Sequence, residues 1–256
     1  MRAKKSYGQH FLKETSIARR IADSLIHTDM YDEVLEIGPG KGMLTQFLLD
    51  RPYTLKAVEA DKDMIAYLNH QYPQLSENLI QEDVLKLDLS EHFDQQFAVI
   101  GNFPYNISSQ ILFKIIDNKT QIPEMVGMFQ KEVARRVASP PGSKEYGVIS
   151  VLIQAWYEVE YLFSVAPGSF DPPPKVQSAI IRLVRRENQE LDCKVSLFRS
   201  VVKTTFGQRR KMLRRTLRPF TKDPRLQEDP FFQRRPETLS VQEFVDITKW
   251  LEEVNC

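Results

Sequence analysis

An amide, two aromatic rings and a proline occur together in the segment Asn102-Phe103-Pro104-Tyr105. The segment follows an apolar run, residues 97–101, that is typical of a buried strand. Asn102 offers a side-chain oxygen, and Phe103, which precedes a proline, offers a backbone carbonyl in an extended conformation. Tyr105 supplies a flat face on which a base can stack. These groups predict a clamp that holds the exocyclic amine of an adenine and directs its nitrogen at an electrophile. The alternative is a turn without a ligand.

A glycine-rich segment, EIGPGKGMLT at residues 36–45, lies between an expected strand and an expected helix. Gly38, Gly40 and Gly42 allow a tight turn and a close approach of the backbone to a ligand at the helix N-terminus. Glu59, 21 residues after Gly38, ends the next expected strand, where its carboxylate can accept hydrogen bonds from both hydroxyls of a ribose. The pattern predicts a nucleoside-containing cofactor, although a plain Gly-rich turn is the other interpretation.

A second carboxylate, Asp83, ends the third expected strand in QEDVLK. In a doubly wound sheet the carboxyl ends of the strands line one crevice, so Gly38, Glu59, Asp83 and Asn102 are expected along it. Asp83 is then placed to accept from an adenine amine of the cofactor. A carboxylate at a strand end can instead serve only as a helix N-cap.

Short apolar runs alternate with helix-like segments, which predicts an α/β domain with a mostly parallel sheet. We expect an apolar helix or strand at residues 148–155 and an antiparallel pair at 159–165 and 178–184, with the stiff loop Asp171–Pro174 between the two strands. From about residue 188 the pattern is helical only. The predicted domains are therefore residues 1–187 and 188–256. The expected parallel strands are residues 34–37, 54–59, 78–81, 97–101 and 125–129, and the expected helices begin near Thr45, Asp63, Ser108 and Lys131.

The composition is that of a globular protein, with 256 residues of which 42% are apolar. The longest nearly uncharged apolar stretch, residues 147–157, is too short to span a bilayer, and no apolar segment follows the basic N-terminus. We expect a soluble, cytoplasmic protein with no membrane association. Cys193 and Cys256 lie far apart and have no Cys or His neighbours, so neither a disulfide framework nor a metal site is expected.

One segment is strongly basic: residues 199–218 contain eight Lys or Arg residues and no acidic residue. As a single helix it would place five of its basic residues within an arc of about 140°, opposite Phe206, Met212, Leu213, Leu217 and Phe220. The five are Arg210, Lys211, Arg214, Arg215 and Arg218. Charged helix faces are usually only solvated, but those faces normally mix signs. We predict that this stripe contacts the phosphate backbone of a nucleic acid without reading its sequence. The predicted contacts are Arg209, Arg210, Lys211, Arg214, Arg215 and Arg218, together with Lys175 from the proline-rich loop.

Six segments in order resemble the motifs of the ribosomal RNA adenine dimethyltransferases, and most closely those of the small-subunit group. They are GQHFL (8–12), EIGPGKGMLT (36–45), VEAD (58–61), QEDVLK (81–86), NFPYNIS (102–108) and FDPPPKVQSA (170–179). The resemblance covers the chain from Gly8 to the C-terminus. It implies a Rossmann-like methyltransferase domain with a small C-terminal all-helical domain, and S-adenosylmethionine as methyl donor without a metal. It also implies dimethylation of two adjacent adenosines near the 3′ end of 16S rRNA. We further expect that the protein acts as a monomer on the immature 30S subunit.

The resemblance also assigns residues. It places a set of residues at the cofactor, namely His10, Leu12, Gly38, Gly40, Glu59, Asp83 and Asn102. Asn102, Phe103, Pro104 and Tyr105 would hold the target adenine, with Phe170 closing over its other face. The chain departs from the pattern at His10, where Asn is usual, at Phe103, where Leu is usual, and at Gln177, where Asp is common. Phe103 would act through its backbone carbonyl, so we expect little effect there. His10 would either donate to the methionine end of the cofactor or lose the contact.

Three other functions compete with this one. The first is a large-subunit rRNA methyltransferase of the macrolide-resistance type, which GQHFL and the triple proline disfavour. The second is a ribosome-assembly or transcription factor that keeps the fold without turnover, as mitochondrial relatives partly do. The intact Asn102, Pro104 and Tyr105 argue against it. The third is an NAD-dependent oxidoreductase, which the GxGxG spacing and the lack of an evident acid/base residue for hydride chemistry disfavour.

Overall fold

The computed structural model describes residues 10–255, which form two compact units. The sheet unit contains residues 10–134 and 158–185, and the helical unit contains residues 135–157 and 186–255. Gly8 and Gln9 of the GQHFL motif, the basic N-terminus and Cys256 lie outside the described residues. Within the described range no helix is long and apolar enough to cross a membrane.

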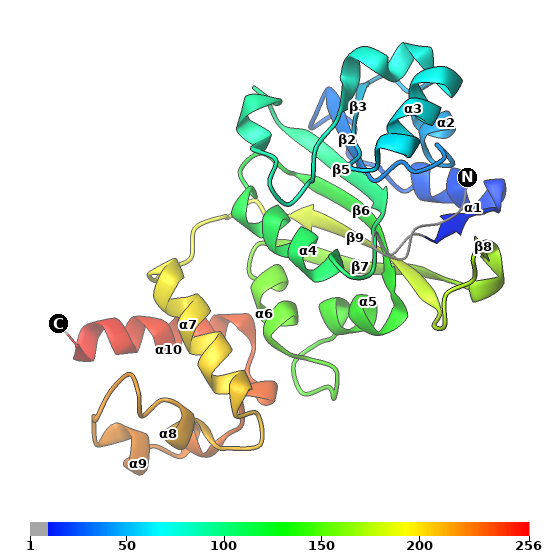
Figure 1. Ribbon diagram of the computed structural model, residues 1–256. Coiled ribbons are helices and arrows are strands. Elements are labelled where there is room, and N and C mark those ends of the chain that lie inside the picture. The colour runs from blue at the N-terminus through cyan, green and yellow to red at the C-terminus, as the bar shows by residue number, and fades with distance from the viewer. Residues whose placement is uncertain (1–9, 256) are drawn as a thin grey trace. The chain divides into compact units, whose positions relative to one another are not determined.

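The sheet unit is built on a seven-stranded sheet with the order β4-β3-β2-β5-β6-β9-β7 (Figure 1). The first five strands in this order pair in parallel, and β9 pairs antiparallel with β6. The prediction of an α/β domain with a mostly parallel sheet is therefore confirmed. The strands are β2 (Glu33–Ile37), β3 (Thr54–Val58), β4 (Leu79–Ile80), β5 (Phe97–Asn102), β6 (Glu124–Gln130), β7 (Tyr157–Val165) and β9 (Ser178–Arg185).

Helices also belong to the sheet unit, and the last of them continues past residue 134 into the helical unit. They are α1 (Thr15–Ala22), α2 (Thr45–Leu48), α3 (Lys62–Gln71), α4 (Ser108–Asp117) and α5 (Lys131–Ala138), with 3₁₀ turns at Pro73–Asn78, Leu89–Glu91 and Pro167–Ser169. The sequence analysis did not predict α1, whose N-cap position, Glu14, makes no side-chain capping bond. Its apolar residues at spacings of three and four, Ala18, Ile21 and Ala22, are buried, so packing rather than a cap stabilises this helix.

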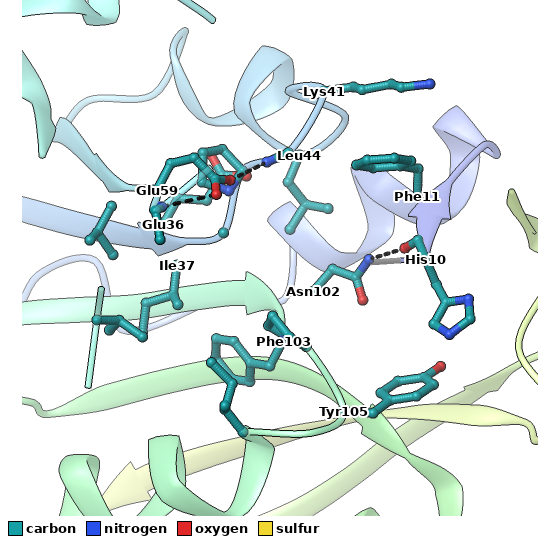
Figure 2. Close-up of a pocket in the computed structure, with 18 of the residues that line it drawn as sticks. His10, Phe11, Glu36, Ile37, Lys41, Leu44, Glu59, Asn102, Phe103 and Tyr105 are labelled. Atoms are coloured by element: carbon teal, nitrogen blue, oxygen red, sulfur yellow. Dashed lines mark hydrogen bonds between the residues drawn. The ribbon is translucent and has the colours of Figure 1, made fainter. Parts of the chain in front are cut away.

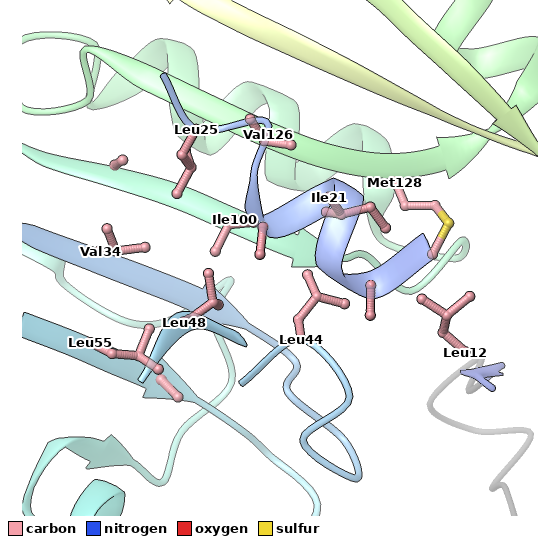
Figure 3. Packing of buried hydrophobic residues seen from close by; sticks show 14 of the residues in the cluster. Leu12, Ile21, Leu25, Val34, Leu44, Leu48, Leu55, Ile100, Val126 and Met128 are labelled. Carbon is pink, nitrogen blue, oxygen red and sulfur yellow. The ribbon is translucent and has the colours of Figure 1, made fainter. Parts of the chain in front are cut away.

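One apolar cluster joins helices α1, α2 and α3 to one face of the sheet (Figure 3). Ala98 and Ile100 of β5 belong to it, as do Val126 and Met128 of β6. Because side chains alternate along a strand, residues 97, 99 and 101 of β5 and residues 125, 127 and 129 of β6 face the other way. Figure 1 shows α4 on that other side of the sheet.

A second, two-stranded sheet joins β1 (Phe11–Leu12) to β8 (Phe170–Asp171), with Leu12 opposite Phe170. The pairing brings residues 11–12, near the start of the described chain, against the beginning of the proline-rich loop. Residues so far apart along the chain pair through tertiary contacts, and neither two-residue strand has a pattern that predicts it from sequence.

The helical unit contains α6 (Val148–Gln154), α7 (Val195–Gly207), α8 (Leu213–Thr216), α9 (Arg225–Glu228) and α10 (Val241–Val254), with 3₁₀ turns at Pro230–Gln233 and Pro236–Thr238. The apolar segment 148–155, left open between helix and strand, is thus a helix. This unit differs from the predicted division at residue 187, because it also includes residues 135–157. The Gln154 amide donates to the carbonyls of Val137 and Ser139, and the Ser150 hydroxyl donates to that of Arg136.

The basic segment 199–218 is not one helix, so the predicted two-faced stripe is wrong in detail. Helix α7 ends at Gly207 and α8 begins at Leu213. The backbone N–H of Leu213 donates to the carbonyl of Arg234, which ties the intervening turn to a later segment of the same unit. Leu213 and Leu217 are buried as expected, whereas Met212 is exposed.

Candidate active site

The carboxyl ends of β2, β3, β4 and β5 meet at a cavity of about 300 Å³ (Figure 2). Gly38, Glu59, Asp83 and Asn102, which the sequence placed at four different strand ends, all line it. The parallel register explains this, because strands that run in the same direction present their carboxyl ends at one edge. The other predicted residues that line the cavity are His10, Leu12, Gly40, Phe103, Pro104 and Tyr105.

The glycine-rich turn has the backbone conformation that its glycines suggested. Gly38, Gly40 and Gly42 have φ angles of 68°, 55° and 76°, in the left-handed region that side chains disfavour. A Cβ on Gly40 would lie 3.1 Å from Cε1 of Phe11, and a Cβ on Gly42 would lie 2.2 Å from Cε2 of Tyr72. The turn is therefore packed on both sides and leaves its backbone facing the cavity.

Tyr72 is a supporting residue that the sequence analysis missed. Its hydroxyl donates to the carbonyl of Gly42 across 3.1 Å, and its ring occupies the space that a side chain at residue 42 would fill. No local pattern marks Tyr72, because it lies 30 residues from the turn that it holds.

Glu59 is buried and oriented by three backbone donors. Oε1 accepts from the N–H groups of Ala60 and Asp61, at 3.0 and 2.9 Å, and Oε2 accepts from Gly40 across 3.3 Å. Burial raises the pKa of Glu59, and the three N–H donors oppose that rise. An ionised carboxylate has about four acceptor positions, so with three of them occupied Glu59 keeps about one for a ligand hydroxyl.

A second buried carboxylate, Glu36, also lines the cavity and was not singled out from the sequence. The Thr45 hydroxyl donates to its Oε2 across 2.7 Å. Burial raises the pKa of Glu36 from 4.5 to about 7, with a smaller contribution from the nearby charge of Glu59. The sequence did contain a signal for Glu36, because a charged residue between Leu35 and Ile37 is unusual in an apolar, buried strand.

Asp83 is half-buried, and its contact with an adenine amine stays a prediction. Its Oδ1 accepts from the N–H of Leu85 across 3.0 Å, which is the local bond of a turn-capping aspartate. The same side chain belongs to the cavity lining.

Asn102 is held by a bond that reaches across 92 residues. Its Nδ2 donates to the main-chain carbonyl of His10 across 3.0 Å. Figure 2 shows the amide oxygen turned away from that bond, in the direction of Tyr105. The acceptor end of the amide therefore faces the cavity.

The side chain of His10 lies between the proline-rich loop and Tyr105. Its Nδ1 is 2.8 Å from the carbonyl of Pro172, and since a carbonyl can only accept, Nδ1 carries the hydrogen. The His10 and Tyr105 rings are 5.4 Å apart between centroids and tilted by 32°. The Tyr105 hydroxyl also shares a hydrogen bond with the Ser178 hydroxyl. This bond and the neighbouring His10 ring hold the Tyr105 ring in place.

Three further residues of the prediction are Phe103, Phe170 and Lys175. The Phe103 ring is 1% exposed and packs edge-on against Phe129, so only its backbone is available to a ligand. Phe170 is 1% exposed, belongs to the apolar cluster and does not line the cavity. Its stacking on a base stays a prediction. Lys175 is exposed in the loop after β8.

Among residues 10–255 no group of three His, Cys, Asp or Glu side chains could hold a metal ion.

The basic residues of the helical unit divide into two groups. Arg209 donates to the carbonyls of Lys144 and Ser143, and its guanidinium lies 3.9 Å from the Glu237 carboxylate. It therefore holds a loop of its own unit. The others are more open: Arg214 is half-buried, and Arg210, Lys211, Arg215 and Arg218 are exposed.

Several known proteins resemble this chain in sequence or in fold. Residues 1–253 match the family described as ribosomal RNA adenine dimethylase. Ribosomal RNA small subunit methyltransferase A of Parabacteroides distasonis is 55% identical over 97% of this chain and 93% of its own length. The crystal structure of a dimethyladenosine transferase from Plasmodium falciparum covers 96% of this chain and 98% of its own, with a TM-score of 0.79 and 25% identity. The 23S rRNA methyltransferase ErmE shares the fold, with a TM-score of 0.69 at 24% identity over 93% of this chain and 99% of its own.

Proposed function

The chain belongs to the ribosomal RNA adenine dimethylase family, and from this membership we infer that it transfers methyl groups from S-adenosylmethionine to the exocyclic amines of two adjacent adenosines of 16S rRNA. The products are dimethyladenosines near the 3′ end of that RNA. The observation that carries the proposal is that Asn102 and Tyr105 line the same cavity as the glycine turn and Glu59, with the Asn102 amide oxygen directed toward Tyr105.

The residues present fit S-adenosylmethionine. The left-handed turn at Gly38 and Gly40 lets the backbone approach the ligand, and we assign the Glu59 carboxylate, which lines the same cavity, to the ribose. We assign Asp83 to the adenine amine of the cofactor and the segment His10–Leu12 to its methionine end. When bound, the cofactor supplies a methyl group on a sulfonium, which is already a good leaving group.

The protein's contribution is mainly positioning. The Asn102 side-chain oxygen and the Phe103 carbonyl accept hydrogen bonds from the target amine, which directs its nitrogen lone pair into the cavity. Tyr105 stacks on the base, and Pro104 holds the carbonyl before it in an extended conformation. Holding two reactants in line in a desolvated site can supply roughly 7–11 kcal/mol of the barrier reduction. Phe170 would have to move from its buried position to cover the other face of the base.

RNA binding is assigned to exposed and half-buried basic residues on each unit. We propose that Arg210, Lys211, Arg214, Arg215 and Arg218 of the helical unit contact phosphates, as does Lys175 of the sheet unit. Arg209, whose guanidinium is engaged within its own unit, supports this surface and does not itself contact RNA. We further propose that the protein acts as a monomer in the cytoplasm, on the immature 30S subunit.

The test is transfer of radiolabelled methyl groups from S-adenosylmethionine to undermethylated small ribosomal subunits, followed by nucleoside analysis. Wild type should yield dimethyladenosine, and Tyr105→Ala should yield much less with unchanged cofactor binding. Label on naked large-subunit rRNA but not on small subunits would point to the macrolide-resistance type of enzyme. Tight subunit binding without any label would favour an assembly factor.

A further inference from the structure

Two glycines on neighbouring strands form a slot that contains the ring of Phe103. Gly101 of β5 and Gly127 of β6 are partners in the strand register. They face away from the apolar cluster that packs under α1, α2 and α3, because the residues of that cluster occupy the alternate positions, such as Ile100 and Val126. The sequence analysis singled out neither glycine.

The slot has no room for a side chain. An ideal Cβ on Gly127 would lie 2.3 Å from Cε2 of Phe103 and 2.8 Å from Cε2 of Phe129. Distances this short are far inside van der Waals contact, so one of the rings would have to move. Both rings are fully buried and pack edge to face with centroids 5.1 Å apart, so neither can rotate into solvent.

The slot is important because the side chain and the backbone carbonyl of Phe103 have different roles. Its side chain lies in the slot, and its carbonyl, two covalent bonds from the Cβ, is the group assigned to accept from the target amine. Pro104 restrains the backbone conformation of Phe103, so a shift of the ring is transmitted to the carbonyl. Asn102, the other acceptor, is the residue immediately before it.

We propose that Gly127 is a positioning residue for methyl transfer: the absence of its side chain creates the slot that seats the Phe103 ring and thereby sets the Phe103 carbonyl. The inference rests on the proposed function, since it is that carbonyl which contacts the substrate. Gly127 itself does not line the cavity, and it acts through Phe103 alone.

Gly127 is a sharper probe than Gly101. A Cβ on Gly101 would meet Cε1 of Phe103 at 2.6 Å, but it would also lie 2.6 Å from the backbone oxygen of Ile37. A substitution at residue 101 would therefore disturb β2 and the glycine turn as well. At residue 127 the nearest atoms are all from the two rings.

The experiment compares Gly127→Ala, Phe103→Leu and the double variant with wild type, in the full-length protein. Gly168→Ala is the matched control, because a Cβ there has nothing within 4 Å and that glycine lies in the same unit. Methyl transfer to undermethylated small subunits gives kcat and KM, and calorimetry with S-adenosylhomocysteine gives the affinity of the cofactor site. Leucine at residue 103 leaves space for a methyl group at 127 and keeps the same backbone carbonyl.

For Gly127→Ala we expect kcat to fall by about a hundredfold, the effect of a displacement near 1 Å, with unchanged S-adenosylhomocysteine affinity. The double variant should recover the activity of Phe103→Leu. Full activity of Gly127→Ala, or a double variant no better than Gly127→Ala, would overturn the inference. If Gly127→Ala does not fold, an active double variant supports the slot and an inactive one refutes it. Inactive wild type would instead refute the proposed function.

Discussion

Nδ2 of Asn102 donates a hydrogen bond to the main-chain carbonyl of His10. This bond decides which end of the amide faces the cavity, because the donor end is already occupied. The acceptor oxygen is left for the substrate, as the proposed reaction requires. The residue next to His10 begins β1, which pairs with β8, so the orientation of the amide depends on a strand from the far side of the sequence.

Asn102→Ala should lower kcat by about 10²–10³-fold, the usual effect of removing one preorganised hydrogen-bonding group from an active site. RNA binding should be nearly unchanged, because the amide is assigned to the cofactor and the target base and to no phosphate. Methyl transfer and subunit pull-down measure the two effects, with Asn118→Ala on the end of α4 as the control. Loss of both activities together would indicate a folding defect and contradict the assigned role.

Glu59→Gln should raise the KM for S-adenosylmethionine by about tenfold or more, because a hydrogen bond to a charged group contributes roughly 1.5–3 kcal/mol. The kcat at saturating cofactor should change little, since Glu59 is assigned to the ribose and not to the reacting atoms. Steady-state kinetics would show this split, with the exposed Glu77→Gln as the control. A fall in kcat at unchanged KM would refute the ribose assignment.

Glu36 should make stability depend on pH. Its pKa is raised from 4.5 to about 7 in the folded protein, so between these values the folded state binds more protons than the unfolded state. Stability therefore falls as pH rises through this window, by on the order of 3 kcal/mol for this residue. Glu36→Gln should remove that fall and leave the protein more stable than wild type at pH 8. Denaturant melts at several pH values measure the difference, and the exposed Glu91→Gln should leave the wild-type profile in place.

Gly42→Ala should abolish S-adenosylhomocysteine binding. The new Cβ would meet the Tyr72 ring at 2.2 Å, and the φ of 76° adds strain of about 1 kcal/mol. Gly142→Ala separates these effects, since Gly142 has a φ of 85° but nothing within 4 Å of its Cβ position. Calorimetry should show wild-type binding for Gly142→Ala. Normal binding by Gly42→Ala would mean that Tyr72 does not hold the turn.

Arg215→Ala should weaken RNA binding uniformly across sequences and reduce the slope of log affinity against log salt by about 1. Arg209→Ala should instead lower the melting temperature and leave the slope unchanged, because its guanidinium serves carbonyls of its own unit. Filter binding over a salt series, together with thermal melts, distinguishes the two arginines. A reduced slope for Arg209→Ala would show that Arg209 contacts RNA phosphates, as the sequence analysis predicted.

Local sequence was enough to predict the strands of the parallel sheet and the edge at which the site lies. Apolar runs mark buried strands, glycines mark the left-handed turn, and the handedness of strand–helix–strand connections leaves few arrangements. The residues that follow each parallel strand are thereby brought to one edge, which is why Gly38, Glu59, Asp83 and Asn102 could be grouped before any coordinates were known.

Long-range packing determined the rest. The pairing of β1 with β8, the bond from Asn102 to His10 and the burial of Phe170 join segments that no local pattern connects. The break after Gly207 overrides a helical pattern because Leu213 bonds to Arg234 instead. The Gly127 slot depends on the ring of a residue 24 positions earlier. Periodicity records which face of an element is apolar, but the partner of each side chain is chosen by close packing among elements that meet only after the chain has folded.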